Sequence, residues 1–254
     1  MMTMTDELVR MEHIKKSFGR VQALNDVIFT VRKNEIVGLL GDNGAGKSTL
    51  IKILSGALTA DSGEIYLNGN KVNIRNTTDA IQHGIETIYQ DSALVAQLSI
   101  ARNLFLGREP IKSPHFLDRM DQSAMNELAR QLIKQVGITK EIPPTTPISS
   151  LSGGERQAVA IARAMHFKSD LIILDEPTNN LGVEETRGVL RFVRNARDSG
   201  CSCIFIAHNI HHVFQVVDRI VVLRRGEKVA DDVDPKRTTI EEVEQIITGM
   251  KYNS

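Results

Sequence analysis

The feature that most constrains this chain is a glycine-rich segment that directly follows a short apolar run. The run extends from Ile36 to Leu40 and is typical of a strand buried on both faces. The segment after it fits the pattern G-x-x-x-x-G-K-[ST], and it consists of Gly41, Asp42, Asn43, Gly44, Ala45, Gly46, Lys47, Ser48 and Thr49. A helix is expected from about Lys47 to Gly56. The order strand, glycine-rich loop, helix predicts a phosphate-binding loop.

The residue types of this loop suit a nucleoside triphosphate. Glycines let consecutive backbone N–H groups point inward and form a nest for an anion, and the start of the following helix adds further N–H groups and a positive dipole end. Lys47 is placed to reach the β- and γ-phosphates. The Ser48 hydroxyl suits Mg²⁺, which takes few protein ligands besides phosphate and water. The alternative is a glycine-rich turn that matches by chance, and the flanking strand and helix argue against it.

A second motif places two acids at the end of another apolar strand. The stretch Leu171–Leu174 is apolar, and Asp175 and Glu176 follow it. Parallel sheets bind ligands at the carboxyl ends of their strands. Asp175 therefore suits the Mg²⁺ shell, and Glu176 suits a general base for an attacking water. A solvated acidic turn is the alternative, which would be the commoner case for this pair of acids on its own.

The other segments predict alternating strands and helices. Strands are expected at Leu8–Ser17, Asp26–Val31, Ile85–Tyr89, Cys201–Ala207 and Ile220–Leu223. Residues from about Asp91 to Ser152 are expected to be mostly helical, with Asp121 as the cap of one helix. A last helix is expected near Ile240–Thr248, because Thr239 and Glu242 form a capping-box pattern.

Composition excludes several classes of protein. The chain has 31 basic and 31 acidic residues, so the net charge is zero, which argues against a nucleic-acid binder. No apolar run approaches the ~20 residues that a membrane helix needs. The first ten residues carry no apolar stretch, so we expect no signal peptide and a cytoplasmic chain. Cys201 and Cys203 fall on one face of a strand, where two small buried side chains are a simpler interpretation than a redox pair or half of a metal site.

Short motifs in order along the chain resemble those of ABC ATPases. One motif resembles the ABC signature, which usually ends in Gln. It consists of Leu151, Ser152, Gly153, Gly154 and Glu155. The run Arg156–Ala164, the segment Glu176–Thr178 and the histidine His208 complete the set. The resemblance implies an α/β P-loop NTPase core with a mainly parallel sheet, a small antiparallel β subdomain and a helical insertion. Residues 1–254 would form one such domain, with the helical subdomain at about 91–166.

The resemblance also implies roles for further residues. Gln90 matches the family's Q-loop, where it would sense Mg²⁺ and the attacking water. His208 matches the switch histidine that contacts the γ-phosphate. Phe18 falls where an aromatic ring stacks on adenine, although an aromatic residue in a first strand is often part of the core. Gly182 departs from the usual Asp, which helps couple the two sites of the family's dimers and leaves the strength of that coupling in this chain open.

The signature implies a dimer. In ABC ATPases it contacts the γ-phosphate bound by the other subunit, so a chain with one phosphate loop and one signature is expected to form a head-to-tail homodimer with two composite sites. Charge stabilisation supplied across a subunit boundary follows the logic of an arginine finger.

The segments Gln97–Glu109 and His208–Ile220 resemble bacterial importers for ribose, xylose and fructose. The expected partners are transmembrane permease subunits and, indirectly, a periplasmic or extracellular sugar-binding protein, with the chain on the inner face of the membrane and no nucleic acid bound. The alternatives are a translation or DNA-repair ABC ATPase and a small-molecule kinase on a P-loop scaffold.

Overall fold

The structure is a computed structural model that describes residues 6–88, 94–112, 119–136, 140–166, 169–179 and 181–249. Its centre is a six-stranded sheet in the order β12-β11-β3-β10-β9-β6. The strands are β3 (Ile36–Leu40), β6 (Ile85–Ile88), β9 (Leu171–Asp175), β10 (Ser202–Ile206), β11 (Arg219–Arg224) and β12 (Glu227–Val233). All neighbouring pairs are parallel except β11 and β12, which are antiparallel. The mainly parallel sheet expected from the sequence is confirmed.

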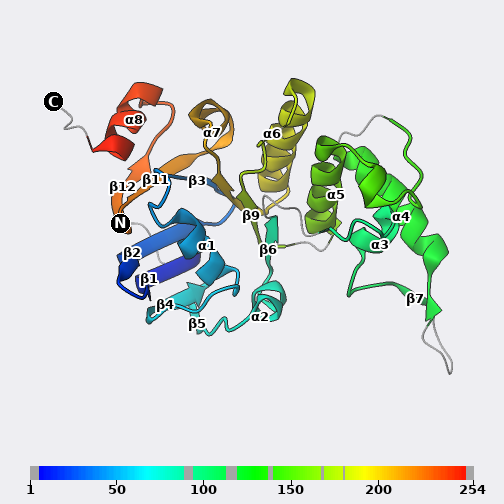
Figure 1. The fold of residues 1–254 in the computed structure, drawn as a ribbon, viewed down its shortest axis with the longest axis horizontal. Coiled ribbons are helices and arrows are strands. Elements are labelled where there is room, and N and C mark those ends of the chain that lie inside the picture. The colour runs from blue at the N-terminus through cyan, green and yellow to red at the C-terminus, as the bar shows by residue number, and fades with distance from the viewer. Residues whose placement is uncertain are drawn as a thin grey trace.

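Alternate residues of the central strands enter two separate apolar cores. Val37 and Leu39 of β3 belong to a core that includes the antiparallel sheet and α1 (Lys47–Leu54). Ile36 and Leu40 of the same strand belong to the core on the other face. That face is covered by α6 (Val183–Asp198), α7 (Ile210–Val216) and α8 (Ile240–Thr248), as Figure 1 shows. Burial on both faces explains why β3 is apolar throughout.

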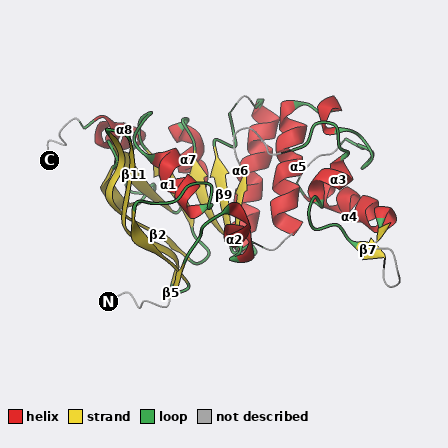
Figure 2. Ribbon diagram, turned by 60° about the horizontal axis from the view of Figure 1, so that its bottom comes forward, coloured by secondary structure: helices red, strands yellow, loops and turns green. Residues whose placement is uncertain are grey.

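A separate antiparallel sheet lies against the first of these cores (Figure 2). Its order is β2-β1-β4-β5, with strands β1 (Glu7–Phe18), β2 (Val21–Arg32), β4 (Ser62–Leu67) and β5 (Asn70–Val72). The short helix α2 (Thr77–Gln82) follows β5 and leads into β6. This sheet confirms the antiparallel part expected from the sequence, and both of its first two strands are longer than expected.

The helical part lies beyond β6, at one end of the molecule (Figure 1). It contains α3 (Ile100–Leu104), α4 (Gln122–Gln135), the 3₁₀ turn Ile148–Ser150 and α5 (Gly153–His166). Asp121 caps α4 as predicted, since its side chain accepts a hydrogen bond from the Ala124 N–H at 3.0 Å. The strands β7 (Ile111–Lys112) and β8 (Arg119–Met120) form a small pair that the sequence did not indicate. The division of the chain into one domain with a helical insertion at 91–166 stays a prediction.

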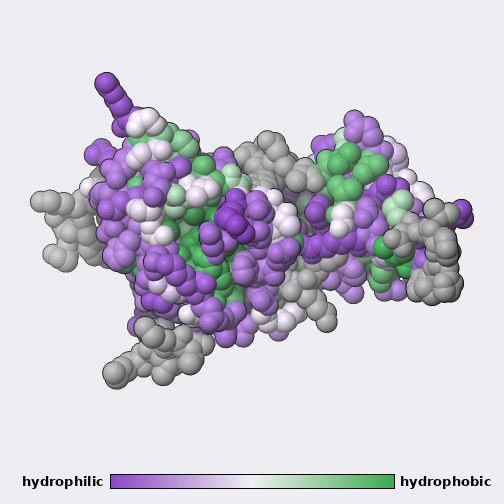
Figure 3. All heavy atoms as spheres, turned by 90° about the horizontal axis from the view of Figure 1, so that it is seen from below, coloured by the Kyte–Doolittle hydropathy of each residue, from purple (hydrophilic) through white to green (hydrophobic). Residues whose placement is uncertain are grey.

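The surface is mostly hydrophilic in the view of Figure 3, with hydrophobic side chains gathered in limited patches. Among the described residues, no helix is long and apolar enough to cross a bilayer.

Candidate nucleotide site

The loop between β3 and α1 has the geometry of an anion cradle. Gly41, Gly44 and Gly46 have φ values of 145°, 78° and 106°, which residues with a side chain rarely adopt. A Cβ on Gly46 would lie 2.7 Å from the Ala23 carbonyl oxygen, so the backbone there needs glycine for space as well. No side chain caps the start of α1, which leaves the first N–H groups of that helix available to an anion.

Lys47 is nearly buried beside this loop. Its Nζ donates to the carbonyl oxygens of Gly41 at 2.5 Å and Asp42 at 3.0 Å. Burial lowers the pKa of Lys47, and the negative charges of Glu176, Asp42 and Asp175 oppose that shift. The ammonium therefore lies in the loop, in surroundings that favour a nearby anion.

The end of β9 faces the loop. Asp175 pairs with Ile206 in the adjacent strand β10, so the residues after both strands meet at one sheet edge. The Glu176 carboxylate lies 2.7 Å from Nε2 of His208, and Asn179 Nδ2 donates to its other oxygen at 3.0 Å. Glu176 has a φ of 53°, a conformation that costs a non-glycine residue about 1–3 kcal/mol and occurs often at functional sites. Its backbone N–H donates to the Ile206 carbonyl at 2.9 Å, which helps to hold this turn.

One open cavity of about 300 Å³ joins these groups. The predicted site residues that line it are Phe18, Asn43, Gly44, Ala45, Gly46, Lys47, Ser48, Thr49, Asp175, Glu176 and His208. Gly41 and Asp42 line a neighbouring cavity, of about 370 Å³, which His208 and Asn43 share. Phe18 is 51 % exposed at the edge of the first cavity, so it is not a core residue, and the Lys16 ammonium lies over its ring at 5.7 Å from the centroid.

Ser48 and Asp175 are suitable ligands for Mg²⁺. Both line the cavity and both offer hard oxygen atoms, the donor type that Mg²⁺ prefers. Burial raises the pKa of Asp175, and the negative charge of Glu176 adds to that shift, so a cation would relieve the cost of ionising it. Gln90, the third predicted ligand, lies outside the described residues. Within the described ranges, no group of three or more His, Cys, Asp or Glu side chains could hold a metal ion.

The five signature residues do not line the 300 Å³ cavity. Leu151 is buried, and Ser152 and Gly153 are exposed at the start of α5. Ser152 N–H donates to Glu155 Oε2 at 2.8 Å, and Glu155 N–H donates to Ser152 Oγ at 3.2 Å. This is a capping box, and the hydrogen bond from the Ser152 N–H is the main cause of the lowered pKa of Glu155. Glu155 in place of the usual Gln thus fixes the start of α5, a role that the spacing S-x-x-E indicates.

Comparison with known proteins identifies the family. A family model described as "ABC transporter" matches residues 24–179. The chain belongs to the ABC transporter family. It is 43 % identical over 240 residues to the fructose import ATP-binding protein FrcA of Rhizobium meliloti, covering 93 % of this chain and 92 % of that protein. It is also 43 % identical over 244 residues to the xylose/arabinose import ATP-binding protein XylG of Sulfolobus acidocaldarius, covering 96 % and 94 %.

A third relative is longer. The ribose import ATP-binding protein RbsA 2 of Streptomyces coelicolor is 39 % identical over 244 residues, and the match covers 96 % of this chain but 46 % of that protein. The predicted resemblance to sugar importers is therefore confirmed, and this member of the ABC transporter family is an ATPase that couples hydrolysis to transport.

Solved structures confirm the fold. An ATP-binding cassette of an ABC transporter in its ADP conformation superimposes with a TM-score of 0.78 at 24 % identity and covers 96 % of both chains. A dimeric cassette in a post-hydrolysis state, bound to ADP and Pi, superimposes with a TM-score of 0.75 at 23 % identity and covers 88 % of this chain and 97 % of that one. At these identities the likeness concerns the fold alone.

Proposed function

We propose that this ABC transporter subunit hydrolyses Mg-ATP in a head-to-tail homodimer to drive the import of a monosaccharide or related carbohydrate. The observation that carries the chemistry is the single cavity in which Lys47, Asp175, Glu176 and His208 meet, with Glu176 and His208 2.7 Å apart. The cargo is inferred from relatives whose names are fructose, xylose/arabinose and ribose import proteins.

The arrangement supports hydrolysis by positioning and charge. The loop N–H groups and Lys47 would hold the β- and γ-phosphates, and Phe18 would stack on the adenine. Ser48 and Asp175, with Gln90, would hold Mg²⁺, which supplies positive charge to the phosphates when bound. Glu176 would take a proton from a water whose oxygen attacks the γ-phosphorus, while the bond to the β–γ bridging oxygen breaks and ADP leaves. His208 would hold the Glu176 carboxylate in place and contact the γ-phosphate.

A second subunit would complete each site. The signature residues of one chain lie outside its own cavity, and the start of α5 is a helix N-terminus with two glycines. In the dimer the signature of the partner would face the γ-phosphate held by Lys47. A cassette of the same fold is dimeric, which supports dimerisation as such.

The transport function requires partners in the membrane. We infer that the chain binds transmembrane permease subunits at the inner face of the cell membrane, and that a periplasmic or extracellular sugar-binding protein delivers the cargo. Co-purification with a permease is the expected result. Binding to ribosomes or DNA at physiological salt would instead favour a translation or repair factor, an alternative that the named relatives do not support. Phosphoryl transfer to a sugar would indicate the kinase alternative.

The test of the chemistry is Glu176→Gln. The amide keeps the shape and the hydrogen bond to His208 but cannot accept a proton, and loss of a general base typically costs ~10²–10⁴-fold in rate. We expect phosphate release to fall by this amount, ATP binding to persist, and ATP to hold the dimer closed in light scattering. The control is Glu184→Gln on α6, which lies outside the 300 Å³ cavity and should hydrolyse ATP as the wild type does. Near-normal turnover of Glu176→Gln would contradict the proposed role.

A further inference from the structure

Glu185 lies in the first turn of α6 and contacts two functional segments at once. Its Oε2 accepts a hydrogen bond of 2.6 Å from the backbone N–H of Gly182, the N-cap residue of α6. The same side chain packs against Gly154 of the signature. A Cβ built on Gly154 would lie 2.4 Å from Cγ and 2.6 Å from Oε1 of Glu185.

Glu185 occupies the space beside Gly154 in which a side chain would lie. Gly154 has an ordinary helical backbone, since its φ is not among the positive values of the described residues. The space where its side chain would lie is filled by Glu185. Gly153 differs, because a Cβ there would meet nothing within 4 Å. A side chain at position 154 would therefore displace Glu185 of the same chain.

The helices α5 and α6 lie side by side with their N-termini at the same end (Figures 1 and 2). They share a groove lined by Gly154 and Glu185 near the helix starts and by Ile161 and Phe192 further along. Both helix ends carry positive dipole potential, so a carboxylate between them is favourably placed. Glu185 bonds one helix start and packs on the other, so its side chain bridges the two helix starts.

The start of α6 is in turn tied to the catalytic acid. The chain runs from Glu176 to Gly182 in six steps, and its first part is closed by a hydrogen bond of 3.1 Å from Asn179 N–H to the Glu176 carbonyl. Asn179 also holds the Glu176 carboxylate. Glu185 therefore contacts Gly154 of the signature and the N-cap of a helix that begins close in sequence to the catalytic acid.

We propose that Glu185 is a positioning residue that fixes the signature relative to the catalytic acid of its own chain, so that the signature meets the ATP of the partner in the right place. The inference rests on the proposed function only in that the signature serves the partner's ATP. Gly182 has no side chain that could make the coupling contact of the usual Asp, and Glu185 makes a contact at this place instead.

The test compares two variants of Glu185 in the full-length protein. Glu185→Ala removes both contacts, whereas Glu185→Gln keeps the side-chain volume and an oxygen for the Gly182 N–H. Since a misplacement of about 1 Å can cost on the order of 10²-fold in rate, we expect kcat for ATP hydrolysis to fall about tenfold or more in Glu185→Ala. The Kd for ATP, measured on dilute subunits without turnover, should stay within about twofold, because the phosphate loop is intact. Glu185→Gln should be close to wild type in both.

Glu184→Ala is the matched control. Glu184 is the adjacent acid in the same helix turn and pairs with Arg187 at 2.7 Å, so its removal takes the same charge from the start of α6. Equal losses in Glu184→Ala and Glu185→Ala would overturn the proposal, as would wild-type kcat in Glu185→Ala or a parallel loss of ATP affinity. If the wild-type protein released no phosphate, the proposed function would be wrong. That outcome is measured on the wild type alone, so it is distinct from a failure of the Glu185 proposal.

A second measurement tests the contact directly. Gly154→Ala should lower the thermal unfolding temperature in the wild-type background, because the new methyl group collides with Glu185. In the Glu185→Ala background the same change should have little effect. An equal loss in both backgrounds would show that Glu185 does not occupy this space and would overturn the proposal.

Discussion

Burial opposes the charges of two residues in the nucleotide cavity. It lowers the pKa of Lys47 and raises the pKa of Asp175, so burial makes the charged form of each side chain less favourable. A triphosphate with its cation would favour the charged form of both. Residues of this kind bind ligand at the expense of the stability of the free protein.

Asp175→Asn should therefore stabilise the nucleotide-free protein at pH 8. Because the pKa of Asp175 is raised in the folded state, the folded protein binds this proton more tightly than the unfolded chain, and the wild type loses stability as pH rises through the raised pKa. Asparagine does not ionise, so its unfolding temperature should exceed that of the wild type at pH 8, and the difference should shrink towards pH 4.

Asp61 is the control for this titration, because its pKa is shifted in the opposite direction. The hydrogen bond from Lys16 is the main cause of the lowered pKa of Asp61, with help from the Ser17 N–H. The ionised Asp61 carboxylate stabilises the folded protein at pH values above the ordinary pKa of Asp. This stabilisation is lost as pH falls through the lowered pKa of Asp61. Asp61→Asn should thus lower the unfolding temperature at pH 8. An Asp175→Asn variant that is also less stable than wild type at pH 8 would contradict the account of the cavity.

For individual residues, the sequence predicted which side chains lie at one site but not which of them are in contact. Motif spacing and the resemblance placed Lys47, Asp175, Glu176 and His208 at one site, and the structure brings them to one cavity. The bond between Glu176 and His208 depends on the register of β9 against β10, which the sequence does not show. The contact between Glu185 and Gly154 was also missed, because it depends on how α6 packs against α5. The position of Glu185 three residues after the N-cap Gly182 is nevertheless a capping signal.

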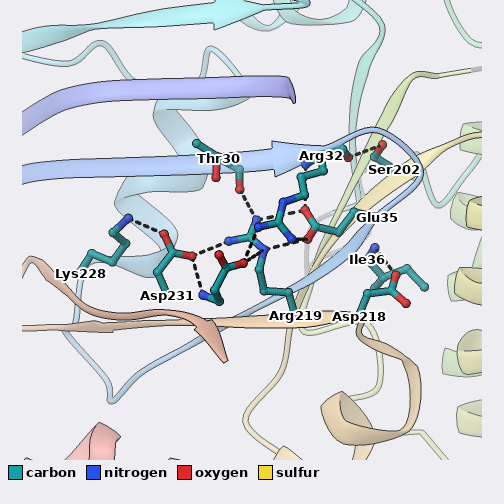
Figure 4. A network of polar contacts seen from close by, with 10 residues as sticks. Thr30, Arg32, Glu35, Ile36, Ser202, Asp218, Arg219, Lys228 and Asp231 are labelled. Carbon is teal, nitrogen blue, oxygen red and sulfur yellow. Dashed lines mark hydrogen bonds and ion pairs between the residues drawn. The ribbon is translucent and has the colours of Figure 1, made fainter. Parts of the chain in front are cut away.

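At the scale of elements, a buried ion-pair network joins the two sheets (Figure 4). The Arg219 side chain of β11 is 4 % exposed and bonds both oxygens of Glu35, at 2.7 and 3.0 Å. It also donates to the Thr30 carbonyl of β2 at 2.8 Å and to Asp231 of β12. One guanidinium thus ties the antiparallel sheet to the edge of the main sheet.

Arg219→Ala should destabilise the protein by up to about 3–5 kcal/mol, because the buried Glu35 carboxylate then keeps only the ion pair with Arg32 at 3.6 Å and the hydrogen bond from the Arg32 N–H. The measurement is urea unfolding of the nucleotide-free chain. Replacing both residues by methionine should recover part of the loss, since no unpaired charge then stays buried. Arg237→Ala is the control, because Arg237 is 87 % exposed in its pair with Asp234 and such pairs contribute little. A loss for Arg219→Ala as small as that of the control would contradict the importance of the network.

The sequence predicted the elements that have a clear apolar period and missed those that lack one. Helices α4 and α8 have an apolar period and capping residues, and both were predicted. Strand β12 was missed because Glu227–Val233 is rich in charge, and its pairing is held partly by Arg219 from another strand. The pair β7 and β8 has two residues in each strand, too few to give a periodic signal.

At the scale of the whole molecule, the chain holds two halves of an ATP site in different places. The phosphate loop and Glu176 line one cavity, whereas the signature begins α5 beside α6. Sequence resemblance implied this separation but could not show that position 154 is crowded by Glu185 while position 153 faces open space. Gly153→Asp is therefore a cleaner signature variant than a change at Gly154, since it adds a charge without an intrachain collision.

The most direct test of the account mixes two inactive variants, Lys47→Ala and Gly153→Asp. Each homodimer should be nearly inactive, the first for want of the phosphate-loop cation and the second because a carboxylate repels the γ-phosphate of the partner. In a mixed dimer, one site combines the intact loop of the Gly153→Asp subunit with the intact signature of the Lys47→Ala subunit. Gly188→Asp serves as the control, because a Cβ there also meets nothing within 4 Å; Gly188 lines the groove between α5 and α6 but is not a signature residue, so the variant should keep wild-type activity.

The measurement is phosphate release from equimolar mixtures under conditions in which dimers exchange, with cross-linking to count mixed dimers. Composite sites predict that mixing restores hydrolysis, to at most about half the wild-type rate per mixed dimer if the two sites act independently. Mixed dimers that form but release no more phosphate than either parent would contradict the claim that the two subunits share each ATP site.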